Sequence, residues 1–235
     1  MTLTAPLSST ALPVLSSSQA KEVDALAQER FGISVEWLME AAGWQVARFC
    51  LGSSVVVCGA GNNGGDGLAA ARHLHRWGFL ARVCCFDAGR LKGPAARELD
   101  ALTRLGIEVS DQLNVANAEL VVDAIFGTGI SRAPEGRFSE WIETINASGA
   151  RVIAVDVPSG LDSDSGVAYA PSVRADLTVT LGLPKPGLTR ADGPRVCGDV
   201  WVADIGVPFE AYAAVGLEVP SDLFAKADRV HLGAP

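Results

Sequence analysis

The stretch SVVVC at residues 54–58 is followed directly by the glycine-rich segment GAGNNGGDG at residues 59–67. The first stretch is mostly β-branched, which is typical of a buried strand, and the glycines behind it allow a tight turn. Apolar residues then recur at helical spacing over residues 68–77. We therefore expect a strand, a turn and a helix in succession, as in a βαβ unit.

The same alternation of strand and helix patterns continues along most of the chain. Helical patterns are expected at residues 19–29, 35–49, 68–77, 94–105 and 138–146, and strand patterns at 54–58, 80–86, 119–126, 152–157, 175–181 and 199–205. Strands that alternate with helices form right-handed βαβ units and a mostly parallel sheet with helices on both faces. The predicted fold class is therefore α/β.

Composition and charge limit the possible classes of protein. Because 49% of the residues are apolar, one large core is expected, so we predict a single domain over residues 19–235 and a flexible N-terminal tail at residues 1–18. The net charge of -8, without a basic run, excludes nucleic acid as an expected partner. No run reaches the roughly 20 apolar residues of a membrane span. Five cysteines without a C-x-x-C pair fit the reducing cytoplasm.

Three of the predicted strands end in polar, glycine-containing turns. These are residues 59–67, residues 126–129 (FGTG) and residues 156–160 (DVPSG). In an open parallel sheet the ligand binds outside the carboxyl ends of the strands, because the connections diverge there. We therefore expect the three turns to meet at one edge of the sheet and to form a binding site.

The first of these turns matches a dinucleotide-binding pattern. Gly59, Gly61 and Gly64 fit G-x-G-x-x-G, and Asp87 ends the next strand, where an acid can bind a ribose. An NAD-dependent oxidoreductase is therefore one interpretation. A glycine-rich turn that merely reverses the chain is another.

Polar side chains distinguish this turn from the usual pattern. Asn62, Asn63 and Asp66 are an unusual lining for a turn that brings bare backbone N–H groups to a pyrophosphate. Asp66 has a second interpretation, in which it caps the helix that follows. The two roles are compatible with each other.

Two acids fall within or at the end of apolar strands. A carboxylate at Asp123 is costly to bury unless it accepts hydrogen bonds, pairs with Arg or binds a cation, and Asp156 has the same character. Together with Asn63 and the hydroxyl of Ser159, these acids supply oxygen ligands of the kind that hard cations prefer. No histidine is well placed as a base, so proton transfer would fall to Asp, Glu or Lys.

Together these segments resemble the YjeF N-terminal domain family, whose enzymes are NAD(P)H-hydrate epimerases. The resemblance extends from about residue 20 to residue 208. It rests on LMEAAG (38–43), the turn at 59–67, VDAIFGTG (122–129), VDVPSGLD (155–162), ADLTVT (175–180), KPG (185–187) and ADIG (203–206). The family often has Asn at the position of Ala41.

The resemblance implies a three-layer, Rossmann-like domain, often a homodimer, that binds one potassium ion per subunit and acts on hydrated NADH or NADPH. By this resemblance the substrate would be contacted by Asn62, Asn63, Gly64, Gly65, Asp66, Gly127, Thr128, Gly129, Ile130, Ser131, Arg132, Ala133 and Asp156. Asn63, Asp123 and Ser159 would hold the potassium ion. Many bacterial relatives carry a dehydratase domain as well, and here we expect the S-specific dehydratase to be a separate protein.

The activity that the resemblance implies is the interconversion of the R and S epimers of NADHX and NADPHX at C6. One carboxyl group can protonate the departing hydroxyl and then take a proton from the attacking water, and the resemblance places Asp156 on the substrate. Lys185 is a further candidate. An NAD-dependent oxidoreductase and a non-catalytic YjeF-type scaffold are the competing interpretations, although a scaffold has no need of this set of polar residues.

Overall fold

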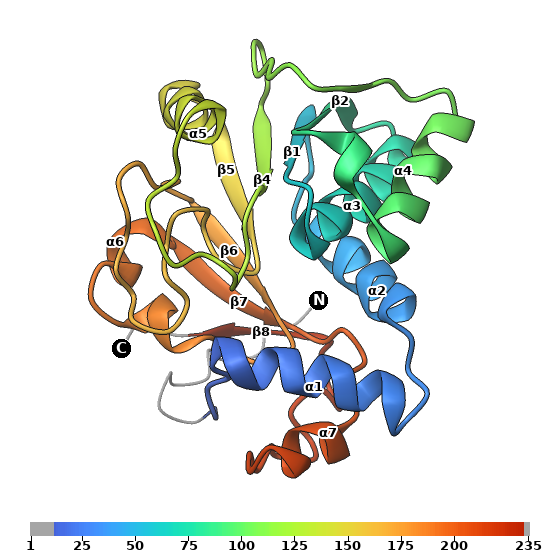
Figure 1. Cartoon of the computed structure of the whole chain (residues 1–235), viewed down its shortest axis with the longest axis vertical. Helices are drawn as coiled ribbons and strands as arrows, with labels where there is room; N and C mark the ends of the chain where they lie inside the picture. The colour runs from blue at the N-terminus through green and yellow to red at the C-terminus, as the bar shows by residue number, and fades with distance from the viewer. Residues whose placement is uncertain (1–11, 233–235) are drawn as a thin grey trace.

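An eight-stranded sheet runs through the computed structural model, which describes residues 12–232 (Figure 1). The strands are β1 (Ser54–Cys58), β2 (Leu80–Cys85), β3 (Val109–Ser110), β4 (Leu120–Ala124), β5 (Arg151–Val155), β6 (Leu177–Leu181), β7 (Asp199–Ala203) and β8 (Arg229–Leu232). The helices are α1 (Ser17–Glu29), α2 (Val35–Ala47), α3 (Asn62–Trp77), α4 (Gly93–Arg104), α5 (Arg137–Ala147), α6 (Gly193–Val196) and α7 (Phe209–Ala214), with 3₁₀ turns η1 (Ala88–Arg90) and η2 (Pro186–Thr189). None of the described helices is both long and apolar enough to span a bilayer.

The order of the strands creates a point where the chain changes direction. The order is β3-β2-β1-β4-β5-β6-β7-β8, and every neighbouring pair is parallel except β7 and β8. The chain builds outward from β1 through β2 and β3, then returns to the other side of β1 and continues from β4. Connections therefore diverge at the carboxyl ends of β1 and β4, where open α/β sheets bind ligands. The prediction of an α/β fold with a mostly parallel sheet is confirmed.

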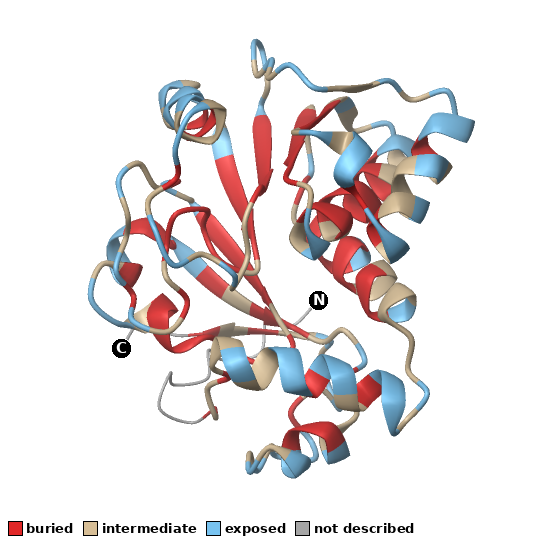
Figure 2. Cartoon of the chain, in the orientation of Figure 1, coloured by how far each residue is buried: buried red, intermediate tan, exposed pale blue. Residues whose placement is uncertain are grey.

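Alternate residues of the strands pack against different helices, so the molecule has three layers. Val56 and Cys58 share a core with α2, α3 and α4, whereas Val55 and Val57 share a core with α5. A third core joins α1 and α7 to β7 and β8. Figure 2 shows that β1, β4 and β5 are buried along most of their length, while the long helices each have a buried and an exposed face.

The helix that follows the glycine-rich turn begins earlier than its apolar pattern predicts. It starts at Asn62 instead of residue 68, with Gly61 as the N-cap residue. Asp66 therefore lies beyond the first turn of α3, and the cap makes no side-chain hydrogen bond. The interpretation of Asp66 as a helix cap is wrong, because the helix begins four residues before it.

Part of the predicted N-terminal tail packs on the domain. Residues 1–11 lie outside the described residues. Leu12 and Leu15 are buried, and the hydroxyl of Ser16 caps α1 by accepting a hydrogen bond from the amide of Gln19 (3.3 Å). The amide of Ser17 donates to Asp164 (2.8 Å), which ties the start of α1 to a distant loop.

A close approach of backbone atoms makes Gly64 sensitive to substitution. A Cβ atom at Gly64 would lie 1.9 Å from the carbonyl oxygen of Gly59, whereas a Cβ atom at Gly61 would meet nothing within 4 Å. We expect Gly64→Ala to lower the free energy of unfolding by about 3 kcal/mol, because backbone atoms cannot move aside easily. The matched control Gly61→Ala should cost about 1 kcal/mol or less, through a poorer helix cap. Urea denaturation measures both, and equal stabilities would contradict this packing.

Candidate active site

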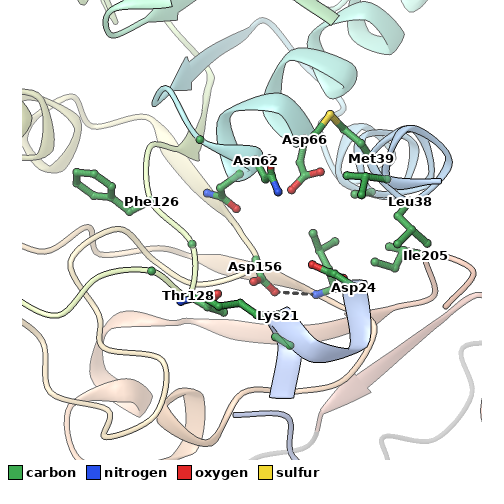
Figure 3. A pocket seen from close by; sticks show the side chains of 18 of the residues that line it. Lys21, Asp24, Leu38, Met39, Asn62, Asp66, Phe126, Thr128, Asp156 and Ile205 are labelled. Atoms are coloured by element: carbon green, nitrogen blue, oxygen red, sulfur yellow. Dashed lines mark hydrogen bonds between the residues drawn. The ribbon is translucent and has the colours of Figure 1, made fainter. Parts of the chain in front are cut away.

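A cavity of about 1010 Å³ opens where the connections of the sheet diverge. Its walls come from the start of α3, the loop after β4, the residue after β5, and helices α1 and α2 (Figure 3). Asn62, Thr128 and Asp156 represent the three polar turns, and all of them line this cavity. The prediction that the turns meet at one edge of the sheet is confirmed.

The structure brings about half of the predicted substrate-binding residues to the cavity. Those that line it are Asn62, Asn63, Asp66, Gly127, Thr128, Gly129 and Asp156. Gly64 and Gly65 are buried within α3 behind the lining. The loop at residues 130–133 lies outside the lining, and its residues Ser131 and Arg132 are exposed. Contact with a substrate stays a prediction for all thirteen residues.

Asp87, the candidate ribose-binding acid of a dehydrogenase, does not line the cavity. It follows β2, and its carboxylate lies 3.7 Å from the guanidinium of Arg90 in a partly exposed ion pair. The candidate ribose-binding acid therefore lies outside the cavity lining, although its neighbours Gly89 and Arg90 belong to it.

Asp156 is held in one orientation by a buried lysine. Its backbone has a φ of +65°, in the left-handed region that Asp tolerates better than most residues. Its Oδ1 atom accepts hydrogen bonds from the amide of Leu181 (3.0 Å), the hydroxyl of Thr180 (3.2 Å) and the ammonium group of Lys185. Lys185 also donates to the carbonyl of Leu181 (2.8 Å). Among the described residues Oδ2 has no hydrogen-bond partner, so it is available to a ligand.

Two more carboxyl groups face the same cavity. Figure 3 shows Asp66, from α3, on the wall opposite Asp156, and Asp24, from α1, on the same side as Asp156. Burial raises the pKa of Asp66 well above its usual range, and the nearby charges of Asp156 and Asp24 raise it further. The surrounding walls also raise the pKa of Asp24 to about 6, although its side chain remains open to the cavity. Asp66 therefore retains its proton at a higher pH than an ordinary aspartate.

Asp123 and Ser159 form a buried cluster beside the cavity. Asp123 is fully buried in β4 and accepts hydrogen bonds from the hydroxyl (2.6 Å) and the amide (2.8 Å) of Ser159 and from the amide of Ile125 (3.3 Å). Burial raises the pKa of Asp123 to about 6. The hydrogen bonds from Ser159 and Ile125 lower this pKa, but burial has the larger effect. The hydrogen-bonded interpretation of this carboxylate is confirmed. It leaves lone pairs free on the carboxylate, so a cation is still compatible with the cluster.

Asn63 approaches this cluster from α3. A Cβ atom at Gly127 would lie 3.2 Å from Oδ1 of Asn63, and the neighbouring amide of Phe126 donates to the hydroxyl of Ser159 (2.9 Å). Nδ2 of Asn63 is buried and lacks a hydrogen-bond partner among the described residues. Since rotating the amide exchanges its nitrogen and oxygen, Asn63 can offer an oxygen to a ligand at this position.

The remaining walls include residues that the sequence does not reveal as site residues. Leu38, Met39 and Tyr212 give the cavity an apolar side. Asp24 and Tyr212 are not predicted, because α1 has an ordinary amphipathic pattern and α7 is too short to be recognised. The only available signal for Asp24 is its place in the first predicted helix, which does not say where that helix packs.

Comparison with known proteins identifies the family of the chain. Residues 35–187 match the family described as YjeF-related protein N-terminus. A bifunctional NAD(P)H-hydrate repair enzyme Nnr of Thermofilum pendens is 41% identical over 209 residues, which cover 81% of this chain and 40% of that protein. An NAD(P)H-hydrate epimerase of Dehalogenimonas lykanthroporepellens is 37% identical over 209 residues, which cover 84% of each protein. The chain therefore spans less than half of the bifunctional relative and most of the epimerase.

A solved structure has a similar fold. The crystal structure of the yeast protein YNL200c superimposes with a TM-score of 0.79 and 26% identity, covering 94% of this chain and all of that one. The family match includes both the start of α3 and Asp156, so it covers the cavity as well as the sheet. The chain belongs to the YjeF-related N-terminal family.

Proposed function

We propose that this protein is an NAD(P)H-hydrate epimerase, which interconverts the R and S epimers of NADHX and NADPHX at C6 for nicotinamide cofactor repair. The observation that carries the proposal is the carboxylate of Asp156, held by Lys185 with one oxygen free at the cavity. The relative of Dehalogenimonas lykanthroporepellens named as an epimerase, which matches this chain over 84% of both lengths, supports it.

The chemistry of the substrate calls for a carboxyl group at this position. The substrate carries a hydroxyl on a ring carbon bonded to nitrogen, so protonation of the hydroxyl lets water leave while the nitrogen lone pair stabilises the planar cation. Water can then return to either face of the ring. We assign Asp156 to proton transfer in this reaction, because Oδ2 is free while Oδ1 is fixed by three donors. Lys185 acts as a positioning residue that also balances the charge of Asp156.

The beginning of α3 is suited to the phosphates of the substrate. The first hydrogen bond of this helix runs from the amide of Gly65 to the carbonyl of Gly61 (3.1 Å), so the preceding amides have no partner within the helix. Such amides and the helix dipole attract a phosphate. Gly61 borders open space and lets a phosphate approach the backbone. The rest of the dinucleotide would extend toward the exposed loop at residues 130–133.

We also propose that one potassium ion per subunit binds to Asn63, Asp123 and Ser159. The donor set supports this proposal, since one carboxylate with neutral amide and hydroxyl oxygens suits a singly charged hard cation. When bound, the ion would add positive charge beside the cavity and would favour binding of the substrate phosphates.

Potassium should stabilise the folded protein. At ten times its dissociation constant the ion would add about 1.4 kcal/mol to the free energy of unfolding, which raises Tm by about 3–6 °C for a domain of this size. Thermal unfolding in potassium chloride and in tetramethylammonium chloride of equal ionic strength measures the difference. Asp123→Asn should abolish it, whereas Asp100→Asn, on the exposed face of α4, should retain it. Equal Tm values for the unsubstituted protein in both salts would contradict the potassium site but not the epimerase function.

A coupled assay tests the epimerase function. An S-specific dehydratase consumes only one half of an epimer mixture, and addition of this protein is expected to bring about consumption of the resistant half as well. Persistence of that half at the uncatalysed rate would refute the proposal. An absorbance change at the nicotinamide band with NAD and a small alcohol or acid would indicate an oxidoreductase instead.

We further propose that the protein acts in the cytoplasm as a homodimer, together with a separate S-specific dehydratase. All five cysteines are unpaired and buried, which supports a reducing compartment. The match to this chain covers 40% of the bifunctional repair enzyme of Thermofilum pendens. A second repair activity joined to that relative supports a dehydratase that acts together with the epimerase. Size-exclusion chromatography with light scattering would test the dimer.

A further inference from the structure

The cavity has carboxyl groups on two opposite walls. Asp66 projects from α3 on one wall, and Asp156 projects from the end of β5 on the other, with the cavity between them (Figure 3). No hydrogen bond joins Asp66 to another side chain among the described residues, so its carboxyl group is also available to a ligand. A flat ring that entered the cavity between these walls would present one face to each acid.

The proposed reaction requires proton transfer on both faces of the ring. The two epimers carry the hydroxyl on opposite faces of C6, so their interconversion removes water from one face and adds it to the other. A single carboxyl group on one wall reaches only one face of a ring held in place. We propose that Asp66 and Asp156 act as a pair of catalytic acids and bases, one for each face of the ring. This inference rests on the proposed epimerase function.

The steps balance without any further reactant. Asp66 in its acid form gives a proton to the hydroxyl on its face, the C6–O bond breaks, and water leaves as the ring nitrogen donates its electron pair. A water on the opposite face then forms a new bond to C6 and gives a proton to the carboxylate of Asp156, while the electron pair returns to nitrogen. Asp66 ends as the carboxylate and Asp156 as the acid, which is the state that the reverse reaction needs. Exchange with solvent restores the first state.

The surroundings of the two acids suit these starting states. Asp156 accepts three hydrogen bonds on Oδ1, including one from Lys185, which fixes the carboxyl group and leaves Oδ2 facing the cavity. Burial favours the protonated form of Asp66, and the charged groups that affect it are Asp156, Asp24, Glu98 and, with the opposite sign, Lys185. Asp66 is therefore suited to start as the acid, and Asp156 on the opposite wall offers a free carboxyl oxygen to the attacking water.

Asp24 is less suited to the second role. It belongs to α1, and Figure 3 places it on the same side of the cavity as Asp156. The charge of Lys185 changes the pKa of Asp24 more than the charge of Asp156 does, which indicates that Asp24 lies close to Lys185. Asp24 would therefore face the same side of the ring as Asp156 and would leave the other side without a proton donor.

Oxygen exchange distinguishes two acids from one. Each purified epimer is incubated in H₂¹⁸O with the unsubstituted protein, Asp66→Asn or Asp156→Asn, and both epimers are then separated and their ¹⁸O content is measured by mass spectrometry. We expect each variant to lose epimerisation by about 10²-fold or more. Each should still exchange oxygen into one epimer, by removal and return of water on the same face. The epimer that exchanges should differ between the two variants.

Three outcomes would overturn the inference. These are epimerisation by Asp66→Asn at the parent rate, exchange into both epimers by Asp66→Asn, and loss of all exchange in a folded Asp66 variant. Asp66→Ala repeats the test with a different side chain, and the exposed control Asp100→Asn should epimerise at the parent rate. If the unsubstituted protein does not epimerise either substrate, the proposed function itself fails, which is a separate result.

A stability measurement checks the acid form of Asp66 without any substrate. Because the pKa of Asp66 is higher in the folded protein than in the unfolded chain, the folded state binds more protons, and stability falls as pH rises above the usual carboxyl range. Asn has no proton to lose. The free energy of unfolding of Asp66→Asn, minus that of the parent protein, should therefore increase as the pH rises from 5 to 8. A difference that does not change with pH would show that Asp66 ionises normally, and the inference would fall.

Discussion

Asp156→Asn lowers the rate of epimerisation by about 10²–10⁴-fold, which is the range expected for loss of a general acid or base. Asn is close to Asp in size and can still accept the hydrogen bonds from Leu181 and Thr180 at its Oδ1 atom. It has no carboxyl group to exchange protons with the hydroxyl or with water. The expected change is therefore in kcat, with a smaller effect on KM.

The measurement is the initial rate from each purified epimer, followed by chromatographic separation of R and S. The matched control is Asp199→Asn, which makes the same chemical change at the exposed start of β7. It should keep the parent rate. An Asp156→Asn variant as fast as the parent would remove Asp156 from the mechanism.

Lys185→Met lowers the free energy of unfolding by about 2–4 kcal/mol. The side chain of Lys185 is only 3% exposed, and it donates to both Asp156 and the carbonyl of Leu181. Removing one partner of a buried ion pair leaves the other charge without compensation, although Asp156 retains access to water in the cavity. The double variant Lys185→Met/Asp156→Asn has no such charge, so its loss should be clearly smaller than the sum of the two single losses.

Urea denaturation of the four proteins completes this double-mutant cycle. Lys226→Met serves as the control, because Lys226 is exposed and lies outside the cavity lining. Its unfolding free energy should change by about 0.5 kcal/mol or less. Additive losses at Lys185 and Asp156 would show that the ion pair does not stabilise the fold.

Strong local patterns account for the correctly predicted elements. The β-branched stretch of β1 predicts its bounds, and the amphipathic patterns of α2 and α5 predict both helices to within about two residues. The start of α3 is not predictable in this way, because glycines have low helix propensity. The glycine at position 64 is required by packing, because a Cβ atom there would clash with the carbonyl oxygen of Gly59. Two-residue β3 and the short α6 and α7 have too few residues for a pattern.

The site was predictable to the extent that it follows the ends of strands. Asp123 and Asp156 stand out because a carboxylate in an apolar strand is costly to bury unless it has a partner. Ligands bind at the carboxyl ends of parallel strands, and this rule places both acids near Asn63. The rule does not indicate that Lys185 is buried against Asp156, or that α1 brings Asp24 to the cavity. Both depend on contacts between segments far apart in the chain, which local patterns do not contain.

The most direct test of the account starts from the pure R epimer of NADHX, without a dehydratase, and follows the appearance of the S epimer over time. We predict that the protein brings the R epimer to the same final mixture as a parallel sample of the S epimer, much faster than the spontaneous reaction, and that Asp156→Asn does not. Formation of the S epimer at the spontaneous rate in the presence of the folded protein would contradict the account.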